Sequence, residues 1–172
     1  MTDWSDVVER HSPLVWRIAY RLLGNESDAA DCTQETFLTA LKFAEQKNVR
    51  DWGALLNRIA TSRALDQLRR RKRDRQRTET TIDDTTMSNT NPNPLQIAVA
   101  DEFADRLIDA LTRIPPQNAE VFSLVCISGL SQQTVANQLQ ITHGNLRAIL
   151  HRTRTQLREI LLDSQTICES RR

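Results

Sequence analysis

The sequence predicts an all-α protein of two small helical domains joined by a flexible linker. Only 5% of the 172 residues are aromatic and only four are glycine, which favours helix over sheet. Apolar residues recur at helical spacing on both sides of residues 76–94, a stretch with six threonines, two prolines and few apolar side chains. Such a composition is typical of a linker. We therefore expect domains at residues 1–75 and 101–172, with residues 76–100 between them.

Three helices are expected in the first domain. Apolar side chains recur at helical spacing from Val7 to Leu23, and Gly24 then offers a stop before Asn25, a suitable N-cap for the next helix. The apolar pattern of the third helix gives way to the basic run RRRKRDRQR, where we expect the helix to be lost. The expected helices cover about residues 7–23, 26–43, and from 51 or 52 to 68.

The second domain has the pattern of a helix-turn-helix. An amphipathic stretch at residues 101–114 precedes a helix that starts at Pro115 and Pro116 and runs to Gly129. Ser131 then caps a short helix, and a brief break leads to Thr142, the expected N-cap of a basic last helix. In this arrangement the second helix of the pair enters the major groove of DNA.

The last helix has an apolar face and, opposite it, a face of small and basic residues. Gly144, Ala148 and Thr155 are small where the helix backbone would approach the bases, and arginines flank them. Long cations at the edges can reach guanine or phosphate. The alternative interpretation is a solvated basic face. The expected core residues are Leu146, Ile149, Leu150, Thr153, Leu157 and Ile160.

The net charge of +1 conceals a strong segregation of charge. Residues 42–77 hold twelve basic and four acidic side chains, whereas residues 25–36 hold four acids and no base. The basic stretch suits phosphate contacts, or is simply a solvated helix end. Asp28, Asp31 and Glu35 lie within about 60° of one another on their helix, so we expect an outward acidic stripe that meets a protein partner or only solvent.

The polar loop before the third helix is a candidate for holding an unpaired base. Its sequence, EQKNVRDW, offers several hydrogen-bonding side chains and one aromatic ring, Trp52. Trp52 is more simply interpreted as a core residue.

No catalytic residue, metal ligand or cofactor site is expected. The three histidines are scattered, and the sequence has no HExxH motif, no glycine-rich phosphate loop and no nucleophile beside a base. The three cysteines form no CxxC pair, and no secretion signal or long apolar run is found, which favours a reducing cytosol without membrane insertion. Cys126, in the apolar stretch FSLVCIS, is expected in the core.

Two separate segments resemble the extracytoplasmic-function (ECF) sigma factors of the sigma-70 family. SPLVWRIAYRLLGNESDAADCTQETFLTAL resembles their first conserved region, with its D-A-E-D-x-x-Q-E-x-F core, and LLNRIATSRALDQLRRRKR resembles the helix that follows. LTRIPPQNAEVFSLVCISGLSQQTVANQLQITHGNLRAILHRTRTQLREIL is similar to their second domain. The resemblance covers residues 7–75 and 104–162, and it implies a region 2 helical bundle followed by a region 4 helix-turn-helix.

The resemblance also implies what each site does. The RNA polymerase clamp would be bound by Asp28, Asp31, Gln34 and Glu35. The minus-ten element would be recognised and melted by Lys47, Asn48, Arg50, Arg58, Ser62, Arg63, Arg69 and Arg70. The minus-thirty-five element would be read by Thr142, His143, Asn145, Arg147, Ala148, His151, Arg152 and Arg154.

The implied function is a cytoplasmic, non-enzymatic initiation factor. Its partners would be the clamp and flap of core RNA polymerase, promoter DNA and, where one exists, a cognate anti-sigma factor. Two alternatives stay open. The chain could be a helix-turn-helix regulator that recruits no polymerase, or a degenerate sigma-like interaction protein, since Ser62 and Ile149 depart from the residues usual in the family.

Overall fold

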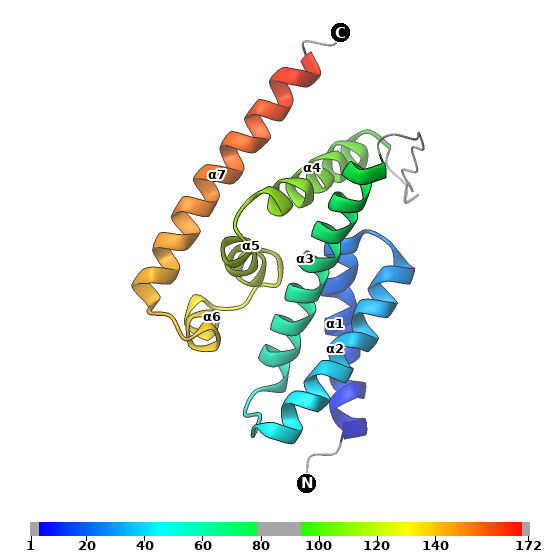
Figure 1. Cartoon of the computed structure of the whole chain (residues 1–172), viewed down its shortest axis with the longest axis vertical. Coiled ribbons are helices and arrows are strands. Elements are labelled where there is room, and N and C mark those ends of the chain that lie inside the picture. The colour runs from blue at the N-terminus through cyan, green and yellow to red at the C-terminus, as the bar shows by residue number, and fades with distance from the viewer. Residues whose placement is uncertain (1–3, 79–93, 170–172) are drawn as a thin grey trace.

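The computed structural model describes residues 4–78 and 94–169, and within them the side chains of residues 4–77 and 102–163. All elements of these ranges are helical, which confirms the all-α prediction (Figure 1). They are α1 (Trp4–Leu23), α2 (Glu26–Gln46), α3 (Trp52–Thr78), α4 (Pro94–Arg113), α5 (Pro116–Phe122), the π-helical turn η1 (Ser123–Ile127), α6 (Gln132–Leu139) and α7 (His143–Glu169).

The first domain is a bundle of α1, α2 and α3. Its core is aliphatic and tightly buried, with Leu22 and Leu56 fully inaccessible to solvent. The predicted cap forms, because Asn25 Oδ1 accepts a hydrogen bond from the Asp28 backbone N–H at 2.9 Å. Asp51 caps α3 in the same way, accepting from the Ala54 N–H at 2.9 Å.

Helix α3 continues through the basic run to Thr78, so the expectation that the helix is lost after Leu68 is wrong. Arginine, lysine and glutamine are good helix formers, and tertiary contacts hold the last turns. Lys72 Nζ, for example, donates to Asp109 Oδ1 of α4 at 2.6 Å. Helix α4 begins at Pro94, before residue 101. The rest of the predicted linker, residues 79–93, lies outside the described residues.

The second domain contains α4 to α7. Both predicted caps form, since Ser131 Oγ accepts from the Thr134 N–H at 3.1 Å and Thr142 Oγ1 accepts from the Asn145 N–H at 3.2 Å. The turn between α6 and α7 places Gln140 in the left-handed region, at φ 55°. The predicted core face of α7 is confirmed for Leu146, Ile149, Leu150, Thr153 and Leu157, all of which are buried.

A widened turn separates α5 from the helix-turn-helix. In η1 the Ser128 N–H donates to the Ser123 carbonyl, five residues earlier, at 2.8 Å. The expectation that Cys126 is a core residue is wrong, because its side chain is exposed within this turn. The extra residue of a π-turn changes which side chains face inward, so an α-helical pattern misplaces this thiol.

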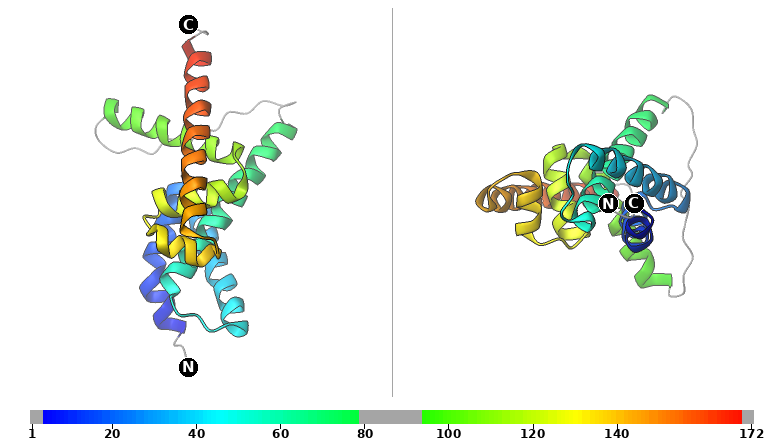
Figure 2. Two further views of the ribbon diagram at one scale, coloured as in Figure 1. Left: turned by 90° about the vertical axis from the view of Figure 1, so that its left-hand side faces the viewer. Right: turned by 90° about the horizontal axis from the view of Figure 1, so that it is seen from below.

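The two domains pack against each other through α3. Figure 1 and Figure 2 show α4 crossing one end of α3 and α5 lying between α3 and α7. Leu65 of α3, 1% exposed, belongs to the same buried cluster as Leu111, Ile114 and Leu157 of the second domain. Arg21 of α1 also donates to the Ile127 carbonyl at 3.2 Å.

Candidate protein and nucleic-acid interfaces

The acidic stripe of α2 is only partly directed outward. Asp31 and Glu35 are exposed, as expected. Asp28 is not, because its carboxylate forms an ion pair with Arg71 and accepts a hydrogen bond from Gln67 Nε2 at 2.9 Å. The expectation of an outward stripe is therefore wrong for Asp28, whose side chain is drawn onto α3.

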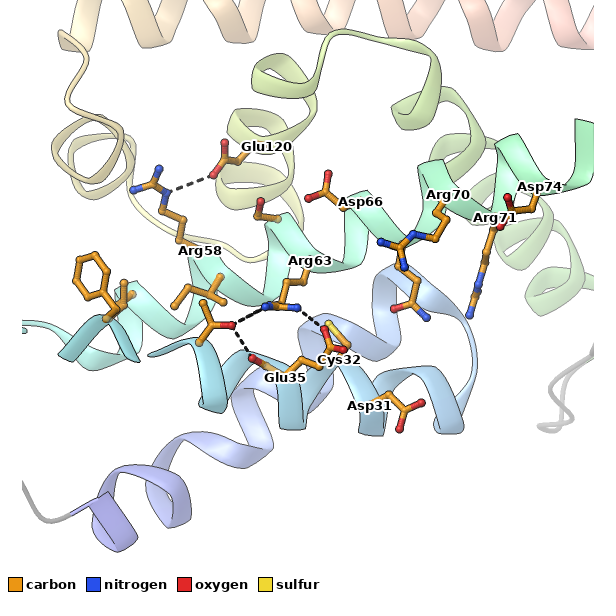
Figure 3. Close-up of a pocket in the computed structure, with 16 residues that line it drawn as sticks. Asp31, Cys32, Glu35, Arg58, Arg63, Asp66, Arg70, Arg71, Asp74 and Glu120 are labelled. Atoms are coloured by element: carbon orange, nitrogen blue, oxygen red, sulfur yellow. Dashed lines mark hydrogen bonds and ion pairs between the residues drawn. The ribbon is translucent and has the colours of Figure 1, made fainter. Parts of the chain in front are cut away.

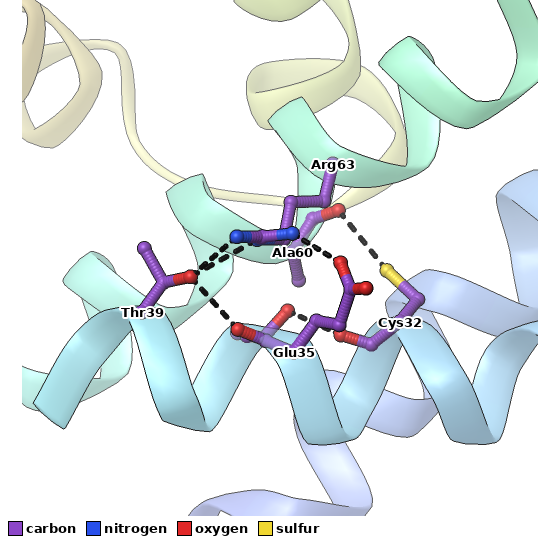
Figure 4. A network of polar contacts seen from close by, with 6 residues as sticks. Cys32, Glu35, Thr39, Ala60 and Arg63 are labelled. Atoms are coloured by element: carbon purple, nitrogen blue, oxygen red, sulfur yellow. Dashed lines mark hydrogen bonds and ion pairs between the residues drawn. The ribbon is translucent and has the colours of Figure 1, made fainter. Parts of the chain in front are cut away.

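Glu35 is exposed but has a partner on α3. Its carboxylate forms an ion pair with Arg63, whose guanidinium also donates to Thr39 Oγ1 at 2.6 and 3.1 Å (Figure 4). Asp31 forms no ion pair or side-chain hydrogen bond within residues 4–77 and 102–163, and Gln34 on the same helix is exposed. Asp31, Gln34 and the Glu35 carboxylate oxygen that is not bonded to Arg63 thus remain accessible to a partner.

A polar cleft of about 890 Å³ lies along α2 and α3 (Figure 3). Acidic and basic side chains alternate around it, including Glu35, Arg63, Asp66 and Arg70. Cys32 lines its floor, and burial raises the pKa of this thiol, outweighing the opposing effects of the Thr36 hydrogen bond and the Arg63 charge. The thiol therefore stays protonated and unreactive near neutral pH.

The residues predicted to meet the minus-ten element fall into two groups. Lys47, Asn48 and Arg50 are exposed together in the loop between α2 and α3, and Arg70 is exposed on α3. Trp52 is half-buried against the core, with its ring edge-on to Trp4 at a centroid distance of 5.4 Å, which supports the core interpretation of this residue.

The other group is engaged within the chain. Arg58 Nη1 donates to the Gln138 carbonyl at 3.0 Å. Its Nε donates to Glu120 Oε1 at 3.3 Å (Figure 3). The Arg69 side chain is only 15% exposed. Arg63 is held by Glu35, and Ser62 is half-buried at the cleft.

All residues predicted to read the minus-thirty-five element lie exposed on one helix and its cap. Thr142 caps α7, and the remaining seven are exposed along it, on the side away from the buried Leu146 and Leu150. Arg154 lies at the edge of this face, where its guanidinium is 4.0 Å from Cys126 Sγ. The structure thus gives α7 the profile of a recognition helix.

One apolar surface was missed by the sequence reasoning. A groove of about 500 Å³ between α4 and α7 is lined by Phe103, Leu107 and Leu161 and edged by Arg106 and Arg158. Phe103 and Leu162 beside it are 53% and 55% exposed. Phe103 and Leu107, spaced four apart in the segment predicted to be amphipathic, are the available sequence signal.

Within the ranges 4–78 and 94–169, no cluster of three histidine, cysteine or acidic residues is arranged to hold a metal ion. None of the helices described is long and apolar enough to cross a membrane.

An all-helical bundle joined to a helix-turn-helix with an exposed basic recognition helix defines a DNA-binding protein. The chain belongs to the sigma-70 family, because residues 7–74 match the model of Sigma-70 region 2 and residues 104–157 match that of Sigma-70, region 4. Its relatives are ECF sigma factors, as the resemblance indicated.

Two relatives illustrate the similarity. The chain is 35% identical over 161 residues to the ECF RNA polymerase sigma factor SigE of Mycolicibacterium smegmatis, covering 94% of this chain and 62% of that protein. It therefore spans less than two thirds of the length of SigE. It is 26% identical over 167 residues to SigW of Bacillus subtilis, covering 93% of this chain and 89% of that protein.

A solved structure supports the fold. The sigma factor RpoE of Bartonella quintana, determined in complex with the anti-sigma factor NepR, is similar with a TM-score of 0.57 and 20% identity. The similarity covers 94% of this chain and 98% of that one. At this level of identity the likeness concerns the fold alone.

Proposed function

We propose that this chain is an alternative sigma factor that binds core RNA polymerase and directs promoter-specific initiation. The observation that carries the proposal is the presence of two different interfaces on one chain. One is the exposed face of α7 that carries small and basic residues. The other is the exposed side of α2 formed by Asp31, Gln34 and Glu35, which we call the acidic edge. A DNA-binding regulator without polymerase recruitment needs only the first.

The acidic edge is proposed to bind the polymerase clamp. Asp31 is exposed and has an unengaged carboxylate in the described structure, and Gln34 and Glu35 adjoin it. Charge-assisted hydrogen bonds to a basic partner surface contribute about 1.5–3 kcal/mol each. The resemblance assigns Asp28 to the polymerase interface as well. We propose instead that Asp28 acts within the chain, because its ion pair with Arg71 holds α2 against α3.

The apolar groove of α4 and α7 is proposed to receive the polymerase flap. Exposed aromatic and aliphatic side chains such as Phe103 and Leu162 suit an apolar helix of a partner protein. The arginines at its rim, Arg106 and Arg158, favour a partner segment with acidic flanks.

The DNA contacts are proposed to divide between the two domains. The loop cations Lys47 and Arg50 would attract the strand of the minus-ten element, with Asn48 available for base contacts. On α7, Arg147 and its exposed neighbours would read the minus-thirty-five element in the major groove. The chain performs no covalent chemistry, uses no cofactor, and works in the cytoplasm with polymerase.

A cognate anti-sigma factor is proposed as a further partner. This proposal is supported by the structurally similar RpoE, which is complexed with the anti-sigma factor NepR. Such a protein would compete with polymerase for the same exposed surfaces.

Run-off transcription with core polymerase, with and without this protein, tests the proposal. Promoter-dependent RNA that requires the chain is expected. DNA binding without RNA would instead identify a regulator, and polymerase binding without promoter-dependent RNA would identify a degenerate interaction protein.

A further inference from the structure

Two side chains of α1 contact the segment where the loop between α2 and α3 runs into α3. We call residues 47–51 the minus-ten loop, because the proposed function assigns its exposed side chains to the strand of the minus-ten element. The start of α1 lies at the same end of the first domain as this loop (Figure 1, Figure 2). None of the residues assigned to DNA or polymerase belongs to α1, so these contacts lie outside the sites described above.

Trp4 makes the first contact. Its ring meets the Trp52 ring edge-on, at a centroid distance of 5.4 Å and an interplanar angle of 69°. The same Trp4 ring meets Phe37 of α2 edge-on, at 6.2 Å and 84°. Edge-to-face packing is a favourable arrangement of aromatic rings. Three helices thus meet at Trp4, and the first residue of α3 is packed against α1 through it.

His11 makes the second contact, from the same side of α1 as Trp4 and about two turns further along the helix. A methyl group placed on Gly53 would lie 3.5 Å from His11 Cε1 and 3.5 Å from Asp51 Oδ1, which are ordinary contact distances. The imidazole therefore lies over the Gly53 backbone, beside the carboxylate that caps α3. Trp4 and His11 together contact the first two residues of α3.

The minus-ten loop has few hydrogen bonds of its own. Its first residue, Lys47, donates its backbone N–H to the Phe43 carbonyl at 3.0 Å, and its last residue, Asp51, accepts from the Ala54 N–H at 2.9 Å. Between these ends, residues 48–50 form no backbone hydrogen bond within the ranges 4–78 and 94–169. The loop is therefore fixed mainly at its two ends, and α1 supports the second end.

A loop that is already fixed binds a strand better than a loop that must first be ordered, because ordering costs free energy on binding. Resting on the proposed function, we propose that Trp4 and His11 are positioning residues for the minus-ten loop. They fix Trp52 and Gly53, and so hold the exposed side chains of the loop in place for the strand without touching it. Trp52 accordingly attaches the loop to α1 and is not a platform for a stacked base.

Loss of these two contacts leaves the core of the first domain in place. Further along α1, Val15 and Leu22 are fully inaccessible to solvent and Ile18 is 2% exposed, and all three belong to the buried cluster of the bundle. Trp4 and His11 are only half-buried. Their truncation should therefore act on the loop more than on the fold of the bundle.

Trp4→Ala in the full chain tests the proposal, with Trp16→Ala as the matched control. Trp16 is a tryptophan of the same helix, 39% exposed, and its ring stacks on Tyr20 at a centroid distance of 4.9 Å instead of on the start of α3. Trp4→Phe is the conservative variant that keeps an aromatic ring at the contact. His11→Ala tests the second contact separately.

Binding of a short fluorescent single-stranded DNA of mixed sequence is the first readout. Trp4→Ala should bind about three- to tenfold more weakly than wild type, because ordering of the loop then adds to the cost of binding. His11→Ala should weaken binding by a smaller factor. Trp4→Phe and Trp16→Ala should both stay within about twofold of wild type.

Hydrogen exchange is the second readout, and it does not depend on DNA. Backbone amides of residues 48–53 should exchange faster in Trp4→Ala than in wild type, whereas amides of α6 and α7 should exchange at the wild-type rate. A general loss of folding would instead speed exchange in both regions. Trp16→Ala should leave the exchange of residues 48–53 unchanged.

Three outcomes would overturn the positioning role. They are equal single-strand affinities for Trp4→Ala and Trp16→Ala, faster exchange throughout the chain in Trp4→Ala, and no measurable single-strand binding by wild type. Absence of run-off RNA with the wild-type chain, alongside intact differences in single-strand binding and exchange, would instead overturn the proposed function and leave the positioning role in place.

Discussion

Arg63 of α3 and Glu35 of α2 form an ion pair that joins a residue predicted to bind DNA to one predicted to bind polymerase. Thr39 completes the network by accepting two hydrogen bonds from the same guanidinium. If polymerase takes the Glu35 carboxylate, Arg63 loses its ionic partner and becomes available for phosphate. The two proposed interfaces are thus coupled through one contact.

A comparison of Glu35→Gln with Asp31→Asn tests this coupling separately from the contribution of each carboxylate to polymerase binding. Both changes should weaken binding to core polymerase, by about 1.5–3 kcal/mol for loss of one charge-assisted contact. Only Glu35→Gln removes the ionic partner of Arg63, so it alone should strengthen binding of the free chain to single-stranded DNA. Fluorescence titrations with polymerase and with DNA measure both effects. An identical DNA affinity for the two variants would contradict the coupling.

Asp28→Asn should destabilise the first domain. The Asp28 side chain is 25% exposed and joins α2 to Arg71 and Gln67 of α3, so its charge stabilises the fold. We expect the free energy of unfolding to fall by about 1.5–3 kcal/mol, as for other hydrogen bonds to charged groups. Urea denaturation measures this, with Asp31→Asn as the control that should leave stability unchanged. Equal stability of both variants would show that Asp28 faces a partner after all.

Arg147→Ala and Arg154→Ala should affect DNA recognition differently. Arg147 lies on the exposed flank of α7, where a guanine contact would contribute about 1–3 kcal/mol of discrimination. Its loss should relax base preference at one or two positions. Arg154 lies nearer to η1, 4.0 Å from Cys126, so its loss should weaken all sequences alike. Selection of binding sites from a randomised upstream element distinguishes these two effects. If both variants lose affinity equally for all sequences, Arg147 does not make a base-specific contact.

Asp109→Asn should alter the dependence of stability on pH. Burial raises the pKa of Asp109, but the hydrogen bond and charge of Lys72, together with Arg113, outweigh it and hold that pKa below the ordinary 3.8. The carboxylate therefore stabilises the folded chain above pH 3.8, and this contribution is lost as the pH falls through the lowered folded-state pKa. Wild type should have the higher Tm at neutral pH. The difference in Tm between wild type and Asp109→Asn should shrink in acid. A difference in Tm that does not depend on pH would show that the carboxylate charge is not its cause.

Gln140→Gly should stabilise the helix-turn-helix. Gln140 has φ 55°, a conformation that costs a residue with a Cβ atom about 1 kcal/mol and costs glycine little. Gly129, at φ 74°, provides the control, because Gly129→Ala should destabilise for the same reason. Thermal unfolding should therefore shift in opposite directions for the two variants. A lower Tm for Gln140→Gly would mean that the glutamine side chain makes a compensating contact.

Local signals were sufficient to predict three helix caps and the apolar face of α7, but not the last turns of α3 or the first turns of α4. Asn25, Ser131 and Thr142 cap helices as their sequence positions indicate, and the apolar face of α7 is buried as its spacing requires. These features depend on residues a few positions apart in the sequence. The positions of capping residues and the hydrophobic periodicity were therefore enough to predict them.

The contacts between elements could not be predicted in the same way. The face of α3 that meets the second domain has one aliphatic residue, Leu65, among the polar Arg58, Thr61 and Lys72, so its periodicity resembles a solvated face although Leu65 is buried. The pairing of Asp28 with Arg71 depends on how α2 and α3 align, which residue spacing within one helix does not specify. The roles assigned to the polymerase-binding and DNA-binding residues stay predictions, to be tested by the variants above.

The π-helical turn at Ser123–Ile127 joins α5 to the segment that leads into the helix-turn-helix. A π-turn holds one residue more than an α-turn in nearly the same rotation, so deleting a single residue there would restore α-helical winding and leave the direction of the following segment nearly unchanged. Ser128 would then stay opposite Thr61, and the recognition helix would keep its orientation. The extra residue is thus absorbed within the turn, which exposes Cys126 without redirecting the second half of the molecule.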